Sequence, residues 1–216
     1  IRLLVVHLIV AENKTLKNLG LNSNCIEEPG LLVLAEYLKI NSQLMTLEVC
    51  SNEFSKVSLI AWGKALKNHP SLLSLRMCGC SISSNGLSFI ESLAQNTHLK
   101  FLELSSNDLD SQFILALARV LQKNKILEKV TLSYNAIPKE AVLRFVKAWA
   151  ASSLKTLDIP FSELDSNAIK EIAKIIEGVD RVLGMPMFTM DMSLDLMDRE
   201  ALTLLNAACD RQQLTA

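Results

Sequence analysis

The 216-residue chain lacks two features that mark common classes of partner, a net charge and a long apolar run. Its formal net charge is only −1, so there is no field to attract a polyanion, and nucleic acid and anionic membrane surfaces are disfavoured. No stretch approaches the roughly 18 uninterrupted apolar residues of a membrane span. We therefore expect neither a nucleic acid nor a membrane as partner.

The sequence also lacks a paired cysteine framework of the kind that staples secreted domains. It has five cysteines, none grouped in pairs at an end of the chain: Cys25, Cys50, Cys78, Cys80 and Cys209. This usage favours a reducing, cytoplasmic compartment. Cys78 and Cys80, with Cys50 earlier, form the one metal-like group, but a tetrahedral zinc site needs four ligands. We expect no metal, with a redox-sensitive cysteine pair as the alternative.

Catalytic signatures are missing as well. Nucleophilic catalysis needs a base held against the nucleophile, and the three histidines, His7, His69 and His98, lie far apart in the pattern described below. Neither Gly-x-x-x-x-Gly-Lys-Ser/Thr nor Gly-x-Gly-x-x-Gly occurs. The sequence predicts a protein that is not an enzyme and needs no cofactor.

What the sequence does have is a repeat. Residues 99–109, LKFLELSSNDL, read Leu-x-x-Leu-x-Leu-x-x-Asn-x-Leu, and five other stretches match this pattern. The matches recur every 27 or 28 residues, beginning at Leu16, Leu44, Leu72, Leu99, Leu127 and Leu154. The ninth-position asparagine is expected to satisfy backbone groups that the turn leaves unpaired. Cys80 and Ser162 replace it in two copies, and we expect Cys80 to point inward.

Each unit divides into a strand and a helix. The Leu-x-Leu core alternates apolar and polar residues, which predicts a short strand with one buried face. The second half has apolar residues four positions apart, as on the buried face of a helix. These pairs are Leu34 and Leu38, Trp62 and Leu66, Leu117 and Leu121, Phe145 and Trp149, and Ile172 and Ile176. The third unit, with Ile90 and Leu93, is one residue shorter.

A repeat of this length and pattern resembles the leucine-rich repeat, in its ribonuclease-inhibitor-like subtype, over roughly residues 1–180. The resemblance implies an α/β fold, a right-handed solenoid in a horseshoe arc with a concave parallel sheet and convex helices. It also implies a non-enzymatic module that binds a partner protein on the concave face. Alternatives within such proteins are a Ran-type regulator of a small GTPase, the ligand-sensing arm of a larger receptor, and a bacterial effector in the host cytosol.

We expect the chain to divide into three parts. Residues 1–15 are read as the helix of a truncated preceding repeat, with a signal-peptide tail as the alternative. Six repeats occupy 16–179, and residues 180–216 form an irregular strand and a helical cap that covers the last apolar face. That last helix could instead bind a partner. Leu3, Leu4 and Leu8 would be exposed if nothing precedes them, and could then drive self-association.

The candidate binding residues are those that the strand alternation turns outward. Glu48, Arg76, Glu103 and Asp158 share one register position and form a charged row, whose simplest explanation is pairing across strands. Three aromatic residues, Phe101, Tyr134 and Phe161, lie on or beside the same face and are candidate interface anchors. Alternatively, these rings pack sideways onto neighbouring loops.

Overall fold

A computed structural model describes residues 15–156, 158–159, 164–179, 189–190 and 199–214. Five strands form one parallel sheet in which neighbours in sequence are neighbours in space. Their bounds are β1 Asn18–Gly20, β2 Thr46–Glu48, β3 Ser74–Arg76, β4 Phe101–Glu103 and β5 Lys129–Thr131. A second, two-stranded parallel sheet pairs β6 (Asp158–Ile159) with β7 (Thr189–Met190).

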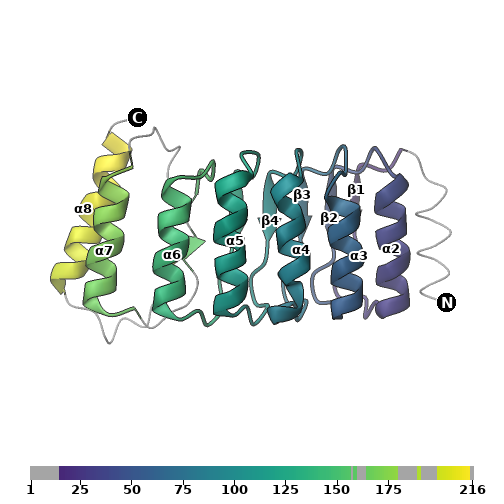
Figure 1. Cartoon of the computed structure of the whole chain (residues 1–216), viewed down its shortest axis with the longest axis horizontal. Coiled ribbons are helices and arrows are strands. Elements are labelled where there is room, and N and C mark those ends of the chain that lie inside the picture. Colours follow the sequence, from purple (N-terminus) through teal and green to yellow (C-terminus); the bar gives the residue numbers. More distant parts are fainter. Residues whose placement is uncertain (1–14, 157, 160–163, 180–188, 191–198, 215–216) are drawn as a thin grey trace.

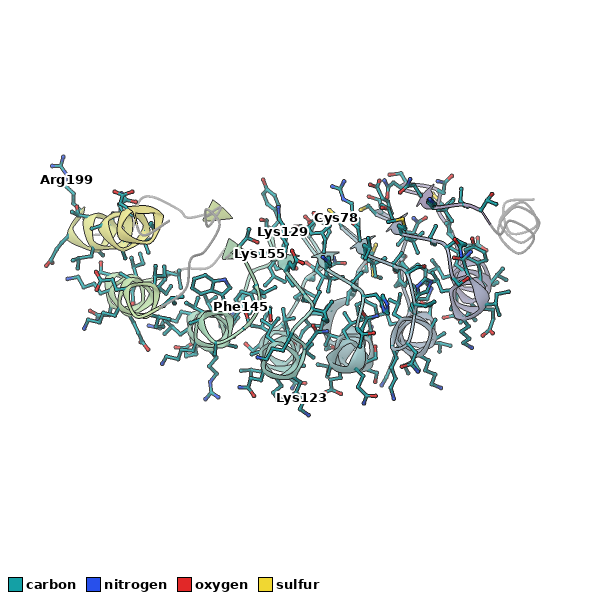
Figure 2. All side chains as sticks on the ribbon, turned by 90° about the horizontal axis from the view of Figure 1, so that it is seen from above. Cys78, Lys123, Lys129, Phe145, Lys155 and Arg199 are labelled. Atoms are coloured by element: carbon teal, nitrogen blue, oxygen red, sulfur yellow. The ribbon has the colours of Figure 1, made fainter. Side chains whose placement is uncertain are left out.

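The helices stand side by side in a row, in the order of the sequence (Figure 1). Their bounds are α2 Glu28–Ile40, α3 Lys56–Leu66, α4 Leu87–Ser92, α5 Ser111–Lys123, α6 Lys139–Ala150, α7 Ser166–Glu177 and α8 Arg199–Leu214. Seen from above, they trace a shallow arc with the strands on its inner side (Figure 2). The prediction of an α/β solenoid with a concave parallel sheet and convex helices is confirmed.

The short third repeat has an irregular helix. Two 3₁₀ turns, Ser83–Gly86 and Leu93–Gln95, flank α4, which is only six residues long. In α3, α5 and α7 a side-chain oxygen accepts a hydrogen bond from a first-turn amide, which fixes where the helix begins. Asp110 caps α5 in this way and Asp165 caps α7, with oxygen-to-nitrogen distances of 2.9 and 2.8 Å.

The repeat leucines form one continuous core between sheet and helices. All the predicted helix pairs are buried, and so is the central apolar residue of strands β2 to β5, as Leu102 illustrates. The register runs straight across the sheet: Gly20, Glu48, Arg76, Glu103 and Thr131 pair in turn. Because every strand keeps this register, side chains at one repeat position stand in a row on the concave face.

Buried asparagines join the repeats where each strand turns toward its helix. The Asn107 amide donates to the carbonyls of Met77, Leu104 and Ser105 at 2.7, 3.0 and 3.1 Å. Its oxygen accepts from the amide of Cys80 at 2.8 Å. Asn52 and Asn135 bond to backbone in the same manner. Each side chain thus bridges its own repeat and the one before it.

Cys80 takes the asparagine position in the third repeat, and it points inward as predicted. Its thiol is buried and donates to the carbonyl of Val49 at 3.3 Å. Burial raises the pKa of the Cys80 thiol to about 12. The residue is therefore a weak structural link rather than a reactive group.

A second row of side chains, which the sequence analysis missed, joins the repeats where each helix ends. Asn124 shows the pattern: its oxygen accepts from the amides of Ile126 and Leu127, and its amide donates to Leu93 of the preceding repeat. The row recurs every 27 or 28 residues, at Asn41, His69, Asn96, Asn124 and Ser152. We call it the helix-end ladder.

The C-terminal helix α8 lies beside α7 (Figure 1) and buries Ala201, Leu205 and Ala208. Leu202 and Cys209 of the same helix are only half-buried. Residues 1–14 lie outside the described residues. The expected N-terminal helix and its Leu3, Leu4 and Leu8 therefore stay predictions.

Candidate protein-binding face

The charged row on the concave face is a network that spans three strands. Arg76 of β3 stands between two carboxylates, with its guanidinium nitrogens 3.5 Å from a Glu48 oxygen and 4.0 Å from a Glu103 oxygen. Glu48 also accepts from the Asn22 amide at 2.9 Å, and Glu103 from the Ser105 hydroxyl at 2.5 Å. Both carboxylates are thus occupied within the sheet, as the cross-strand interpretation expected.

Arg76 is held only weakly by its two carboxylate partners. The Arg76 side chain is 46% exposed and neither of its contacts is short, whereas the Glu103 side chain is only 13% exposed. Exposed pairs of this kind contribute about 0–1 kcal/mol to stability. The charged row fixes the positions of these side chains on the concave face, but it contributes little to the free energy of unfolding.

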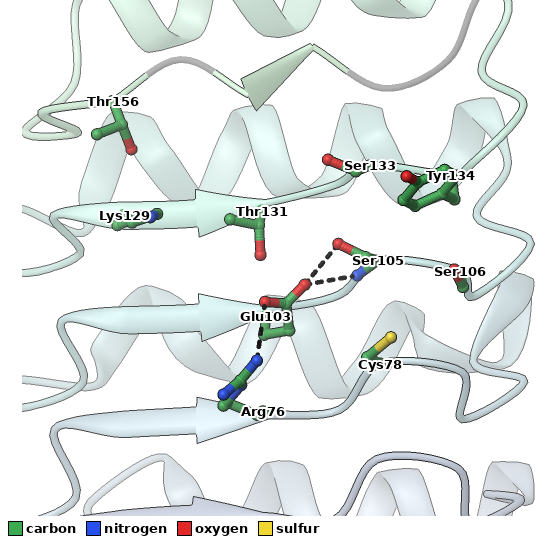
Figure 3. A pocket seen from close by; sticks show the side chains of 10 residues that line it. All are labelled: Arg76, Cys78, Glu103, Ser105, Ser106, Lys129, Thr131, Ser133, Tyr134 and Thr156. Carbon is green, nitrogen blue, oxygen red and sulfur yellow. Dashed lines mark hydrogen bonds and ion pairs between the residues drawn. The ribbon is translucent and has the colours of Figure 1, made fainter. Parts of the chain in front are cut away.

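Next to this row lies a hollow of about 350 Å³ between β3 and the start of the sixth repeat (Figure 3). Its lining combines two cations and one carboxylate with hydroxyl groups from three successive repeats. The lining residues are Arg76, Cys78, Glu103, Ser105, Ser106, Lys129, Thr131, Ser133, Tyr134 and Thr156. The lining residues are therefore mostly polar or charged, although the larger part of the surface that they expose is apolar, and three of the seven predicted binding residues are among them.

Lys129 stands apart from the paired charges. Its ammonium nitrogen lies 5.5 Å from the centroid of the Phe101 ring, a cation–π distance. It forms no ion pair within the described part of the chain. Phe101 is half-buried and does not line the hollow, and its role as an interface anchor stays a prediction.

Two threonine hydroxyls beside Lys129 are unsatisfied. The Oγ1 atoms of Thr131 and Thr156 are shielded from solvent and have no hydrogen-bond partner among the described residues. A buried hydroxyl without a partner costs about 1–3 kcal/mol. The fold therefore tolerates two unfavourable polar groups in the wall of the hollow.

Tyr134 is the exposed aromatic residue at the rim (Figure 3). Tyr134 is 69% exposed, and its backbone is in the left-handed region, with φ at +59°. The equivalent residues of the first four repeats share that conformation but are small: Ser23, Ser51, Gly79 and Ser106, with φ from +55° to +62°. The sixth repeat has Phe161 at this position, which lies outside the described residues. A bulky side chain at positive φ is unfavourable by roughly 1–2 kcal/mol.

Cys50 and Cys78, which follow strands β2 and β3, are reduced and close together. The backbone amide of Cys78 donates to the Cys50 sulfur at 3.2 Å, and both thiols are free. Burial, followed by the nearby Cys50 and Glu103, raises the pKa of the Cys78 thiol. A raised thiol pKa lowers the thiolate fraction and hence the reactivity.

Two further predicted residues, Asp158 and Glu48, are not among those that line the hollow. Asp158 begins β6 and pairs in register with Thr189 of β7, in the second sheet. Phe161 lies outside the described residues. Glu48 belongs to the charged row but does not line the hollow. The sequence analysis named no role for Lys129 or Thr156, although both share the repeat position of Phe101.

The described residues hold no group of three or more His, Cys, Asp or Glu side chains placed to bind a metal ion. None of the helices described is both long and apolar enough to cross a membrane.

Comparison with known proteins agrees with the repeat architecture. Residues 95–118 match a family model described as a leucine-rich repeat. Leiomodin-1 actin-binding site 2 is similar in structure, with a TM-score of 0.52, 21% identity, and 71% of this chain and 90% of that chain covered. The C-terminal domain of a tropomodulin from Caenorhabditis elegans has a TM-score of 0.56 at 13% identity, covering 75% and 95%. At these identities the similarities show the fold.

Proposed function

We propose that this leucine-rich-repeat protein is a non-enzymatic module that binds a partner protein on its concave face, with Tyr134 as the central contact. The row of repeats makes a rigid, extended platform there. The hollow beside Tyr134 offers hydroxyl and charged groups around one exposed ring, and interface energy is typically concentrated on such rings.

The observation that carries this proposal is the backbone conformation of Tyr134. Four equivalent positions hold serine or glycine at the same positive φ, so the turn itself does not require a ring. The ring is mostly exposed and so gains little from burial. Strained backbone that the fold does not need points to a function for the side chain.

A Tyr134→Gly variant separates binding from folding. Glycine relieves the left-handed strain and loosens the unfolded chain, so the free energy of unfolding should stay unchanged or rise by up to about 1 kcal/mol. Binding should fall by about 2 kcal/mol or more, as for an interface hot spot. Urea denaturation measures the first, and capture of proteins from a cytosolic extract, quantified by mass spectrometry, measures the second.

Val57→Ala is the matched control, because Val57 is exposed on α3 in the convex layer. A protein captured by the native chain and by this control, but lost with Tyr134→Gly, would support the proposal. Equal capture by all three chains would place the binding surface elsewhere and overturn it.

Actin is a specific second proposal for the partner. One similar structure is titled as an actin-binding site of leiomodin-1. Co-sedimentation of the purified chain with actin filaments tests this directly. Pelleting by the native chain that is lost with Tyr134→Gly would assign actin to the concave face. Absence of pelleting would reject actin and leave the protein-binding proposal to the capture experiment.

A further inference from the structure

We propose that the hollow beside Tyr134 seats a carboxylate side chain from an acidic segment of the partner, with Lys129 as the cation that binds it. This inference rests on the proposed function and assigns the chemistry of the group that the concave face recognises.

The charges of the hollow leave one cation without a counterion. Arg76 and Lys129 are positive and Glu103 is negative. Arg76 and Glu103 already contact each other, and Glu103 also accepts from the Ser105 hydroxyl. Lys129 contacts only the Phe101 ring among the interactions that the structure shows for it. Lys129 is therefore the cation of the hollow that has no carboxylate partner among the described residues, and it can pair with a single carboxylate from outside.

The unsatisfied hydroxyls identify where the carboxylate binds. Thr131 lies two residues after Lys129 on β5. Thr156 occupies, in the next repeat, the position that Lys129 has in its own, so the two threonines flank Lys129 (Figure 3). Rotation about the Cα–Cβ bond exchanges a threonine's hydroxyl with its methyl group and can turn the hydroxyl into the hollow. A carboxylate accepts hydrogen bonds at both oxygens. One ammonium and two hydroxyls supply the donors that such an anion needs.

The surrounding charge favours the same ligand. Lys100, just before β4, and Lys155, in the repeat after β5, share one carboxylate, Glu128, with nitrogen-to-oxygen distances of 3.0 and 2.5 Å. Lys129 follows Glu128 directly in the sequence, so the segments that lead into these strands hold three lysines and one glutamate. Such an excess attracts an acidic segment, even though the chain as a whole is near neutral.

A carboxylate fits better than a phosphate group. A phosphate carries nearly two charges at neutral pH and usually pairs with several cations. Arg76 is already held between Glu48 and Glu103, so Lys129 alone is available. The occupant is therefore aspartate or glutamate in an exposed acidic stretch.

A capped, fluorescent hexaglutamate peptide tests the proposal by anisotropy titration at low ionic strength. The native chain should bind it and should not bind a hexaglutamine peptide. Lys129→Gln should raise the Kd about tenfold, the size expected for one charge-assisted hydrogen bond. Lys123→Gln is the matched control, since it removes the same charge from α5 on the helix side of the molecule (Figure 2).

A second variant guards against misfolding as the cause of lost binding. Replacing Thr131 and Thr156 together by valine keeps their shape and removes both unsatisfied hydroxyls. The variant should bind hexaglutamate several-fold more weakly while its Tm rises. Loss of binding with a higher Tm cannot come from unfolding.

Three outcomes would overturn the proposal: no binding of hexaglutamate by the native chain, equal weakening by Lys129→Gln and Lys123→Gln, or tighter binding of a phosphoserine peptide. These outcomes leave the proposed function intact if partner capture still depends on Tyr134. Conversely, a Lys129-dependent hexaglutamate site together with Tyr134-independent capture would retain the carboxylate site and reject the proposed function.

Discussion

Replacing Asn107 by alanine should lower the free energy of unfolding by about 3–5 kcal/mol, since each buried backbone group left without a partner costs about 1–3 kcal/mol. The Asn107 amide is fully buried and satisfies carbonyls of two consecutive repeats as well as the amide of Cys80. Alanine offers none of these bonds, and the cavity is too enclosed for water to restore them all.

Urea denaturation followed by circular dichroism measures this loss. Asn85→Ala is the matched control because Asn85 is an exposed asparagine in the preceding repeat, and its substitution should change stability by less than about 0.5 kcal/mol. A loss below about 1 kcal/mol for Asn107→Ala would mean that the asparagines do not join the repeats energetically.

Lowering the pH from 7.5 to 5 should destabilise the chain by about 2 kcal/mol through His69 alone. Burial, and secondarily the nearby His98, lowers the pKa of His69 from 6.5 to about 4. Its Nδ1 accepts from the amides of Ser71 and Leu72, which a protonated ring could not do. Between the two pKa values the unfolded chain binds the proton and the folded chain does not, so stability falls as the pH falls.

A His69→Asn variant should remove this dependence. Asparagine occupies the same position of the helix-end ladder at three other repeats, so the substitution should preserve the fold at pH 7.5. Urea denaturation at both pH values measures the difference, with the exposed-site variant Asn85→Ala as control. If the native chain and His69→Asn lost the same stability on acidification, His69 would not be the group responsible. Carboxylates with lowered pKa, such as Asp165 and Glu128, add their own losses only at more acidic pH.

The sheet and its register were predictable because they follow from a strict spacing. Leucines two residues apart fix which face of each strand is buried, and the constant period places Glu48, Arg76 and Glu103 in one row. The inward position of Cys80 followed in the same way from its place in the repeat. The separate two-stranded sheet of β6 and β7 was not predicted, because Asp158 fits the spacing of the earlier strands.

The helix-end ladder was present in the sequence but escaped notice because its residues differ. Asparagine, histidine and serine can all accept a hydrogen bond from a backbone amide. His69 and Ser152 therefore replace asparagine in this row, and no single residue type marks the position in every repeat. Its 27- or 28-residue spacing was the signal that could have found it.

Only part of the candidate site could be predicted from the sequence. Alternation correctly turned Arg76 and Glu103 toward the concave side, but it could not show that Ser105 occupies the Glu103 carboxylate. Nor could it show that Lys129 lies over Phe101 or that two threonine hydroxyls lack partners, because these depend on side-chain rotamers. The positive φ of Tyr134 was indicated by the sequence, since the matching positions of the first four repeats hold serine or glycine.

Hydrogen–deuterium exchange of the chain with and without its captured partner tests the central claim most directly. The account predicts that the partner slows exchange in residues 101–106 and 129–134, around β4, β5 and Tyr134, and leaves the helices α2 to α7 unchanged. Protection confined to those helices or to α8, with none on the strands, would contradict it.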